Sequence, residues 1–262
     1  MGHRGNAEEP GRLQIHDIEE TGPDGTRCVA RCVAGVVRPG DRFDGGDLTV
    51  ERLDRPLRPH LEFVDPPHAV RVWLTGPGVR SLRPRLVIAT AGPRRYGYVG
   101  PRELWHAAAD GPAGLAIATA ADLRAWTAEQ TAADLAEPFT YVVDRDGLLR
   151  LAPRRSEHVA CAGRGEVLAA GEISWARDAA GDWSAVEVSN LSTGYAPDPE
   201  CWPSVAAALD AAGLAHPGRL THAVVFRRCA EPACAALNLV RDEEYACAVC
   251  AAPLPRDWNA AA

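Results

Sequence analysis

Four cysteines near the end of the chain place the strongest constraint on how it can fold. Cys229 and Cys234 are separated by four residues, twelve residues follow, and Cys247 and Cys250 are separated by two. A structural zinc site takes four thiolates at the corners of a tetrahedron, each about 2.3 Å from the metal. Two short cysteine turns that face each other supply this geometry. The spacing therefore predicts one Zn²⁺ bound by Cys229, Cys234, Cys247 and Cys250.

The segment between the two cysteine pairs, LNLVRDEEYAC, has the pattern of a strand, an Asp-Glu turn and a second strand. This pattern predicts a zinc ribbon over residues 226–258. Because all four ligands are thiolates, no coordination position is left for water, and the predicted zinc is structural rather than catalytic. The alternative is that the four cysteines are reduced, buried side chains without a metal.

Residues 13–90 have the pattern of a small β-barrel. Short runs rich in β-branched residues, such as RCVARCVAGVV and RLVIAT, are separated by the turn clusters GPDG, RPGD and DGGD. Five or six short strands at this spacing favour a barrel over an open sheet.

The run TRCVARCVAGVVRPGDRF resembles the second, barrel-forming domain of translational GTPases, with Gly35, Gly40 and Asp41 at its turn. The later run HAVRVWLTGPGVRSLRPRLVI is similar to the closing half of the same domain. The resemblance implies a fold and not an activity. The chain has no lysine and no phosphate-loop Gly-Lys-Ser/Thr, so GTP hydrolysis is not implied.

Residues 91–103 are rich in Gly, Pro and Arg and are predicted to form a linker. Residues 104–225 mix helical and strand patterns: FTYVVD and LLRLA flank an Asp-Gly hairpin signal, and SVAAALDAA is a helix that ends at Gly213. The predicted fold class is therefore α+β. It comprises an N-terminal small β-barrel, a central α+β module rich in antiparallel strands, and a C-terminal zinc ribbon.

The central module resembles a β module near the C-termini of some bacterial secreted effectors and toxin-like proteins. In that pattern a His-bearing strand, an Ala-Gly-Glu strand and a Ser-Gly-His-Tyr-x-Pro turn follow one another. Here AGE at residues 170–172 and STGYAP at residues 192–197 occupy matching places, and the strand-like run HVACA precedes them. Gly194 stands where the pattern has His, so any chemistry of that His is lacking here.

Three residues of this module are candidates for catalysis. His158 would act as a general base, Glu172 would orient it, and Tyr195 would place a ligand. Each has a structural alternative: a half-buried strand histidine, a carboxylate that satisfies a turn, and a tyrosine ring packed on the core. Separately, Arg94 and Arg95 beside Tyr96 and Tyr98 could stack on a nucleobase, or could form a hinge or a segment that docks on a partner.

Composition narrows the function further. All 28 basic residues are arginine, which excludes catalytic lysines of the Schiff-base and pyridoxal-phosphate classes. The formal charge of −7 disfavours broad nucleic-acid binding. There is no signal-peptide-like apolar run and no stretch approaching the roughly 18 apolar residues of a membrane span. Cys28 and Cys32 lie about 13 Å apart if extended, too far for a disulfide. These features predict a cytoplasmic protein without membrane contact.

Three functions fit this sequence. The first, which we favour, is a non-enzymatic zinc-ribbon adaptor or scaffold that binds a protein partner in the bacterial cytoplasm. The second is an enzyme, or a decayed enzyme, of toxin or effector type that uses His158, Glu172 and Tyr195. The third is an RNA- or ribosome-associated factor, which would need a basic face.

Overall fold

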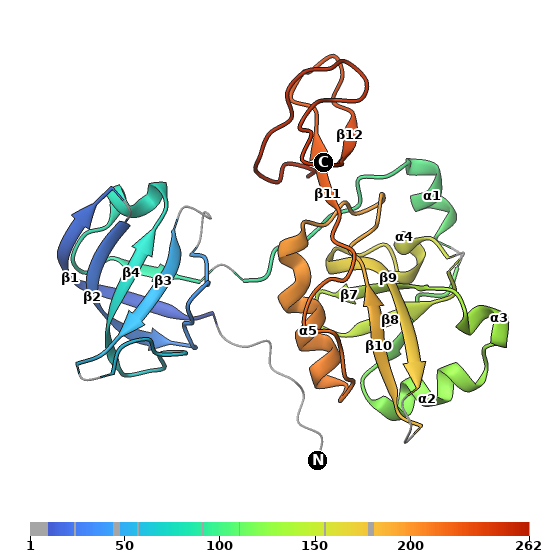
Figure 1. Ribbon diagram of the computed structural model, residues 1–262, viewed down its shortest axis with the longest axis horizontal. Helices are drawn as coiled ribbons and strands as arrows, with labels where there is room; N and C mark the ends of the chain where they lie inside the picture. Colours follow the sequence, from blue (N-terminus) through green and yellow to red (C-terminus); the bar gives the residue numbers. More distant parts are fainter. Residues whose placement is uncertain are drawn as a thin grey trace. The chain divides into compact units, whose positions relative to one another are not determined.

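A computed structural model describes residues 10–23, 25–43, 48–56, 58–90, 92–109, 111–154, 156–177 and 181–261. The chain divides into two compact units, Met1–Gly92 and Pro93–Ala262, which we describe separately (Figure 1). The observed class is α+β with mostly antiparallel strands, as the sequence predicted. Among the described residues, none of the helices combines the length and the apolar character needed to cross a membrane.

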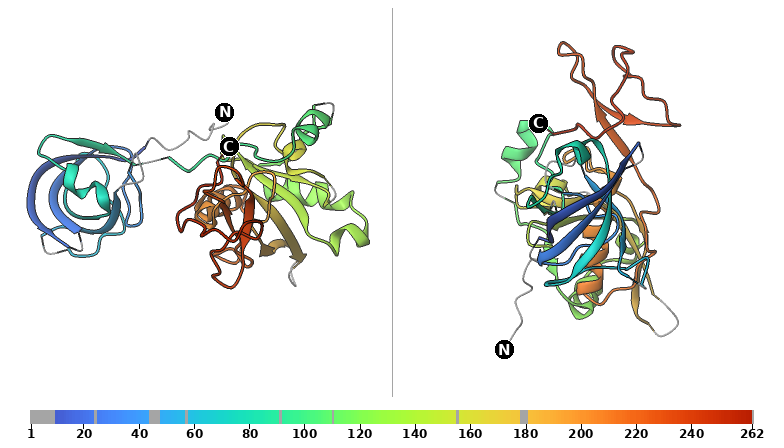
Figure 2. Two further views of the ribbon diagram at one scale, coloured as in Figure 1. Left: turned by 90° about the horizontal axis from the view of Figure 1, so that it is seen from above. Right: turned by 90° about the vertical axis from the view of Figure 1, so that its left-hand side faces the viewer.

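The first unit is a single antiparallel sheet with strand order β3-β4-β2-β1-β5. Its elements are β1 (Arg12–Gly22), β2 (Gly25–Ala34), β3 (Thr49–Asp54), β4 (Ala69–Thr75), a 3₁₀ turn η1 (Pro77–Ser81) and β5 (Val87–Ala89). The sheet curls into a half-barrel, which is visible in Figure 2. Bulges in the pairing of β1 with β2 and of β3 with β4 increase the local twist and help the sheet to curl.

Alternation of side chains builds the core of this half-barrel. Leu13 and Ile15 on β1 face Cys28, Ala30 and Cys32 on β2, and all five side chains are completely buried. The two cysteines lie on the same face of one strand and act as small apolar residues. Burial raises the pKa of Cys28 to about 11, which keeps this thiol protonated and unreactive at neutral pH.

The sheet of the second unit has the order β10-β9-β7-β8-β6, and all its neighbouring strands are antiparallel. The strands are β6 (Leu115–Ile117), β7 (Phe139–Asp144), β8 (Leu149–Ala152), β9 (Val167–Arg177) and β10 (Trp183–Val188). The apolar run of β7 is buried on both faces, as its central position requires. The Asp-Gly hairpin joins β7 to β8, and Gly147 takes the left-handed φ of 79° that such a turn needs.

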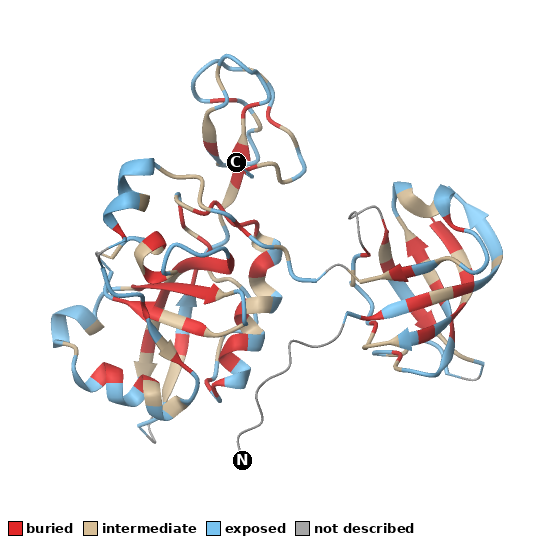
Figure 3. Cartoon of the chain, turned by 180° about the vertical axis from the view of Figure 1, so that it is seen from behind, coloured by how far each residue is buried: buried red, intermediate tan, exposed pale blue. Residues whose placement is uncertain are grey.

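Short helices surround this sheet. They are α1 (Arg102–Ala107), α2 (Ala120–Ala128), α3 (Ala132–Leu135), α4 (His158–Cys161), η2 (Pro199–Cys201) and α5 (Trp202–Ala211). Thr119 and Thr131 begin α2 and α3 with capping boxes, which satisfy backbone N–H groups that a short helix leaves free. Val205 and Leu209 of α5 pack into the same core as β7 and β9, and Figure 3 shows buried residues concentrated on these strands.

Part of the segment 91–103 is built into the second unit. The backbones of Tyr96 and Val167 exchange two hydrogen bonds of 2.8 and 3.0 Å, and the N–H of Val99 donates to the Gly194 carbonyl at 2.7 Å. Tyr96 is 1% exposed. The aromatic residues of this segment therefore pack inward on the module.

Gly171 on β9 provides a test of the packing in the second unit. A Cβ at this position would collide with the backbone carbonyl of Ser189, which strand pairing holds in place. Gly171→Ala should lower the free energy of unfolding by roughly 2 kcal/mol, because a backbone atom cannot yield as a side chain can. Urea unfolding followed by tryptophan fluorescence measures this, since six of the seven tryptophans lie in the second unit.

Gly97→Ala is the matched control, because its added Cβ would meet no atom within 4 Å. This variant should unfold like the wild type. An equal loss of stability in both variants would contradict the packing argument.

Candidate metal centre

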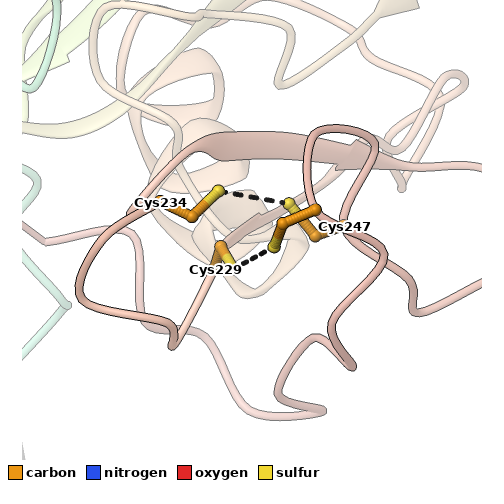
Figure 4. Close-up of side chains that lie close together, drawn as sticks. Cys229, Cys234 and Cys247 are labelled. Atoms are coloured by element: carbon orange, nitrogen blue, oxygen red, sulfur yellow. Dashed lines mark hydrogen bonds between the residues drawn. The ribbon is translucent and has the colours of Figure 1, made fainter.

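The first cysteine pair occupies the loop of a two-stranded hairpin, β11 (Val225–Arg228) and β12 (Leu237–Val240). The N–H of Cys229 donates to the Ala236 carbonyl at 2.8 Å, and the N–H of Cys234 donates to the Glu231 carbonyl at 2.9 Å. Ala235 follows in the left-handed region, with φ 47°. The four residues between Cys229 and Cys234 thus form a compact turn that leaves both thiols on its inner side (Figure 4).

The second cysteine pair follows a tight turn at the end of β12. Asp242 and Glu243 both have positive φ, 50° and 57°, which is the conformation of a type I′ hairpin turn. The chain then returns to Cys247, whose N–H donates to the Ala252 carbonyl at 2.8 Å. The N–H of Ala251 closes the second knuckle on the carbonyl of Cys247 at 2.9 Å.

The four thiols converge (Figure 4). The sulfur atoms of Cys229 and Cys250 are 3.5 Å apart, those of Cys234 and Cys247 are 3.7 Å apart, and all four lie within 4.8 Å of one another. A tetrahedron of sulfurs about 2.3 Å from a zinc ion has edges of about 3.8 Å. A disulfide would bring two sulfurs to about 2 Å. The cluster therefore has the dimensions of a site for one metal ion.

Backbone and side-chain donors support one thiolate of the cluster. The N–H groups of Cys250 and Val249, the amide of Asn238 and the Cys234 thiol lower the pKa of Cys247. Asn238 Nδ2 lies 3.5 Å from Cys247 Sγ and 2.8 Å from the Ala236 carbonyl, so this one side chain contacts both cysteine loops. A metal needs the deprotonated thiolate, and these donors favour it.

Sequence analysis did not identify Asn238 as part of the site. The sequence signal was weak, because asparagine is disfavoured in strands and this one stands in the strand-like run between the two cysteine pairs. The structure shows that it is buried on β12. Its Oδ1 accepts a hydrogen bond of 2.9 Å from the Ala248 N–H, which aligns the second knuckle with the first.

The base of the hairpin is attached to the STGYAP turn. The guanidinium of Arg227 lies 3.4 Å from the Asp198 carboxylate and donates to the Arg256 carbonyl at 2.7 and 3.0 Å. Trp258 Nε1 donates to the carbonyl of Ala196 at 2.9 Å. Arg94 stacks over the Trp258 ring at 4.7 Å. The predicted arginine–aromatic cluster thus uses Arg94 for an internal contact.

His158 and Tyr195 direct polar side-chain atoms at backbone carbonyls, whereas the printed contact of Glu172 is made by its own backbone N–H. His158 begins the helix α4, and the strand predicted for HVACA is wrong, because Ala160 and Cys161 donate their N–H groups back to the Glu157 carbonyl. Its Nε2 lies 3.0 Å from the Gly171 carbonyl oxygen. The Glu172 N–H lies 3.2 Å from Ser189 Oγ, and the buried Tyr195 hydroxyl donates to the Gly165 carbonyl at 2.8 Å.

The second unit has cavities of about 360 and 620 Å³ in its described part, and neither is lined by His158, Glu172 or Tyr195. Gly194, which replaces the histidine of the effector-like pattern, lies under the ring of Tyr98, and a Cβ there would be 2.8 Å from that ring. A side chain at 194 would therefore displace Tyr98.

Comparison with known proteins identifies no family. No protein-family model matches the chain, and a search of curated proteins finds no similar sequence. The structure contains the curled half-barrel and the four-cysteine cluster, whereas the resemblances to translational GTPases and to effector modules stay predictions.

The cluster generates a prediction of metal content. The wild-type protein should hold one zinc per chain, and Cys247→Ser should lose it and become protease-sensitive after about residue 226. Asn238→Ala should weaken zinc affinity by about 10- to 100-fold, since it removes the amide that supports Cys247. Elemental analysis and competition with a chelator measure both effects.

Cys201→Ala is the matched control, because Cys201 is a buried thiol outside the cluster. It should retain zinc like the wild type. Full zinc content in Cys247→Ser, with an ordered C-terminal segment, would refute the site.

His158 generates a prediction of pH dependence. Burial lowers the pKa of His158, whereas the unfolded chain keeps an ordinary value near 6.5. As pH falls, the unfolded state binds the proton first. The free energy of unfolding should therefore decrease from about pH 7 towards the lowered folded pKa, by at most about 1.4 kcal/mol per pH unit.

His158→Gln retains a donor for the Gly171 carbonyl and cannot titrate. Urea unfolding of both proteins at about pH 7 and pH 5.5 should show a stability difference that changes with pH. A difference that stays constant would contradict the assignment to His158.

Proposed function

We propose that this chain is a non-enzymatic adaptor that binds a protein partner in the bacterial cytoplasm through a zinc ribbon. The observation that carries the proposal is the cluster of four thiols within 4.8 Å of one another. Bound there, Zn²⁺ would supply four bonds that hold the two cysteine loops together. Cys229, Cys234, Cys247 and Cys250 would hold it, with no ligand position open to substrate.

The small core of the ribbon supports a structural role for the metal. The apolar cluster around the cysteine loops has only three buried members among the described residues, Cys229, Cys247 and Leu254, and two of these belong to the thiol cluster itself. So little apolar burial cannot order a segment of this length without a further crosslink. The hairpin and its loops stand out from the central sheet in Figure 1, which leaves them accessible to a partner.

An exposed valine in the second knuckle supports protein binding. Val249 is 74% exposed, the highest value among the exposed large apolar side chains of the described chain, and it lies between two of the cluster cysteines. Leu239 on β12 is 38% exposed. The buried core of a protein interface is more apolar than the rest of the surface, so these exposed apolar side chains suit a contact there. The rest of the ribbon surface would supply a polar rim.

The placement of the catalytic candidates supports a non-enzymatic function. His158 and Tyr195 direct polar atoms at backbone carbonyls and stabilise the module. The state of the cysteines supports a reducing compartment, because Cys28, Cys32, Cys161 and Cys201 are buried thiols in addition to the four of the cluster.

The test is affinity capture from bacterial cytosol with wild-type protein and two valine variants. Val249→Asp places a charge at the proposed contact and should lose the partner while keeping its zinc. Val186→Asp is the control, because Val186 is also exposed, at 43%, but lies on β10. It should capture the partner like the wild type.

Two outcomes would overturn the adaptor proposal. One is that Val249→Asp captures every protein that the wild type captures. The other is that every captured protein is released by nuclease treatment, which would favour the RNA-associated alternative.

A further inference from the structure

A cavity of about 620 Å³ in the second unit lies away from the metal centre. It forms where the segment that leads into α1 crosses the chain after α4. Its lining includes Tyr98, Arg102, Trp105, His106 and Arg164. The volume is within the usual range for sites that bind small molecules, about 300 to 1,000 Å³.

Aromatic and cationic groups form one wall of this cavity. The guanidinium carbon of Arg164 lies 4.4 Å from the centre of the Trp105 ring, so the planar cation covers one face of the indole. The ring of His106 meets Trp105 edge-on, with 5.3 Å between centroids. A guanidinium stacked on an indole is held flat, and its N–H groups remain available to an anion.

The backbone conformation at Arg164 indicates that the arginine side chain has a role in the cavity. Arg164 has φ 64°, in the left-handed region that favours glycine, and it follows Gly163 with φ 57°. The turn needs only the N–H of residue 164, which donates to the Val159 carbonyl at 2.9 Å. Glycine would make that hydrogen bond with less strain. An arginine that tolerates this conformation therefore points to a role for the guanidinium at the cavity wall.

Tyr98, another lining residue of the cavity, packs closely against its neighbours. Tyr98 packs edge-on against Tyr195, with 5.7 Å between ring centroids, and lies directly over Gly194. The Tyr195 hydroxyl is bonded to the carbonyl of Gly165, another lining residue. The STGYAP turn thus fixes the position of an aromatic ring in the wall.

The charges in the cavity select the class of ligand. Arg102 and Arg164 contribute two permanent positive charges to the lining, and the carboxylate of Glu166, which is also a lining residue, lies 4.0 Å from Arg145. Two guanidinium groups suit a phosphate, to which they can donate pairs of hydrogen bonds. Three aromatic rings, those of Tyr98, Trp105 and His106, suit a planar base. We propose that this cavity binds a nucleoside diphosphate, with its phosphates on Arg102 and Arg164 and its base against the rings.

The test is isothermal titration of the full-length, zinc-loaded protein with ADP, GDP, UDP and CDP. At least one should bind, and its nucleoside and pyrophosphate alone should each bind at least 10-fold more weakly. Arg164→Gly should weaken binding of that nucleotide at least 10-fold without lowering the unfolding midpoint, since glycine suits the left-handed backbone.

Arg177→Ala is the matched control. Arg177 stacks on Trp183 at 4.6 Å, as Arg164 stacks on Trp105, but it is not part of this cavity. It should bind the nucleotide like the wild type. The proposal is overturned if none of the four nucleotides binds at 1 mM, if pyrophosphate binds as tightly as the nucleotide, or if Arg164→Gly binds it like the wild type.

Discussion

The side chains of Arg227 and Asp198 meet at 3.4 Å inside the second unit, with 8% and 9% of their surfaces exposed. A single charge at this depth would be costly, so each of the two ions depends on the other. The Nε and Nη2 groups of the guanidinium donate to the carbonyl of Arg256, which lies beyond the second cysteine pair. One buried ion pair thereby joins the start of the cysteine hairpin, the chain that follows it and the end of the STGYAP turn.

The position of the cysteine cluster depends on this junction. Trp258 and Asn259 add hydrogen bonds to this junction. The Trp258 indole N–H donates to the Ala196 carbonyl, and the Asn259 side-chain amide bonds to both the N–H and the carbonyl of Arg228. Arg94 covers the Trp258 ring. The four cysteines therefore project from a base that belongs to the module, whereas the loops that carry them have a very small apolar core. A metal in the cluster would hold the loop end of the hairpin, whereas packing holds its base.

Structural features that depend on a few neighbouring residues were predicted correctly from the sequence. The half-barrel strands alternate buried and exposed residues, the Asp-Gly hairpin has its left-handed glycine, and the helix before Gly213 ends where the sequence indicates. The run HVACA was predicted as a strand and is the short helix α4. A run of this length has no periodicity that separates the two, and only the hydrogen bonds to Glu157 and the left-handed turn at Gly163 select the helix.

The sequence by itself determined the fold class and the four cysteines that could hold one metal ion, because ligand spacing and strand alternation are encoded within a few neighbouring residues. Only the tertiary structure decided the partners of polar side chains. It placed Asn238 against Cys247, His158 against the carbonyl of Gly171, and Arg164 over Trp105. These contacts join segments that are 9, 13 and 59 residues apart in the chain. No local pattern specifies such distances, because they follow from how the sheet and its loops pack.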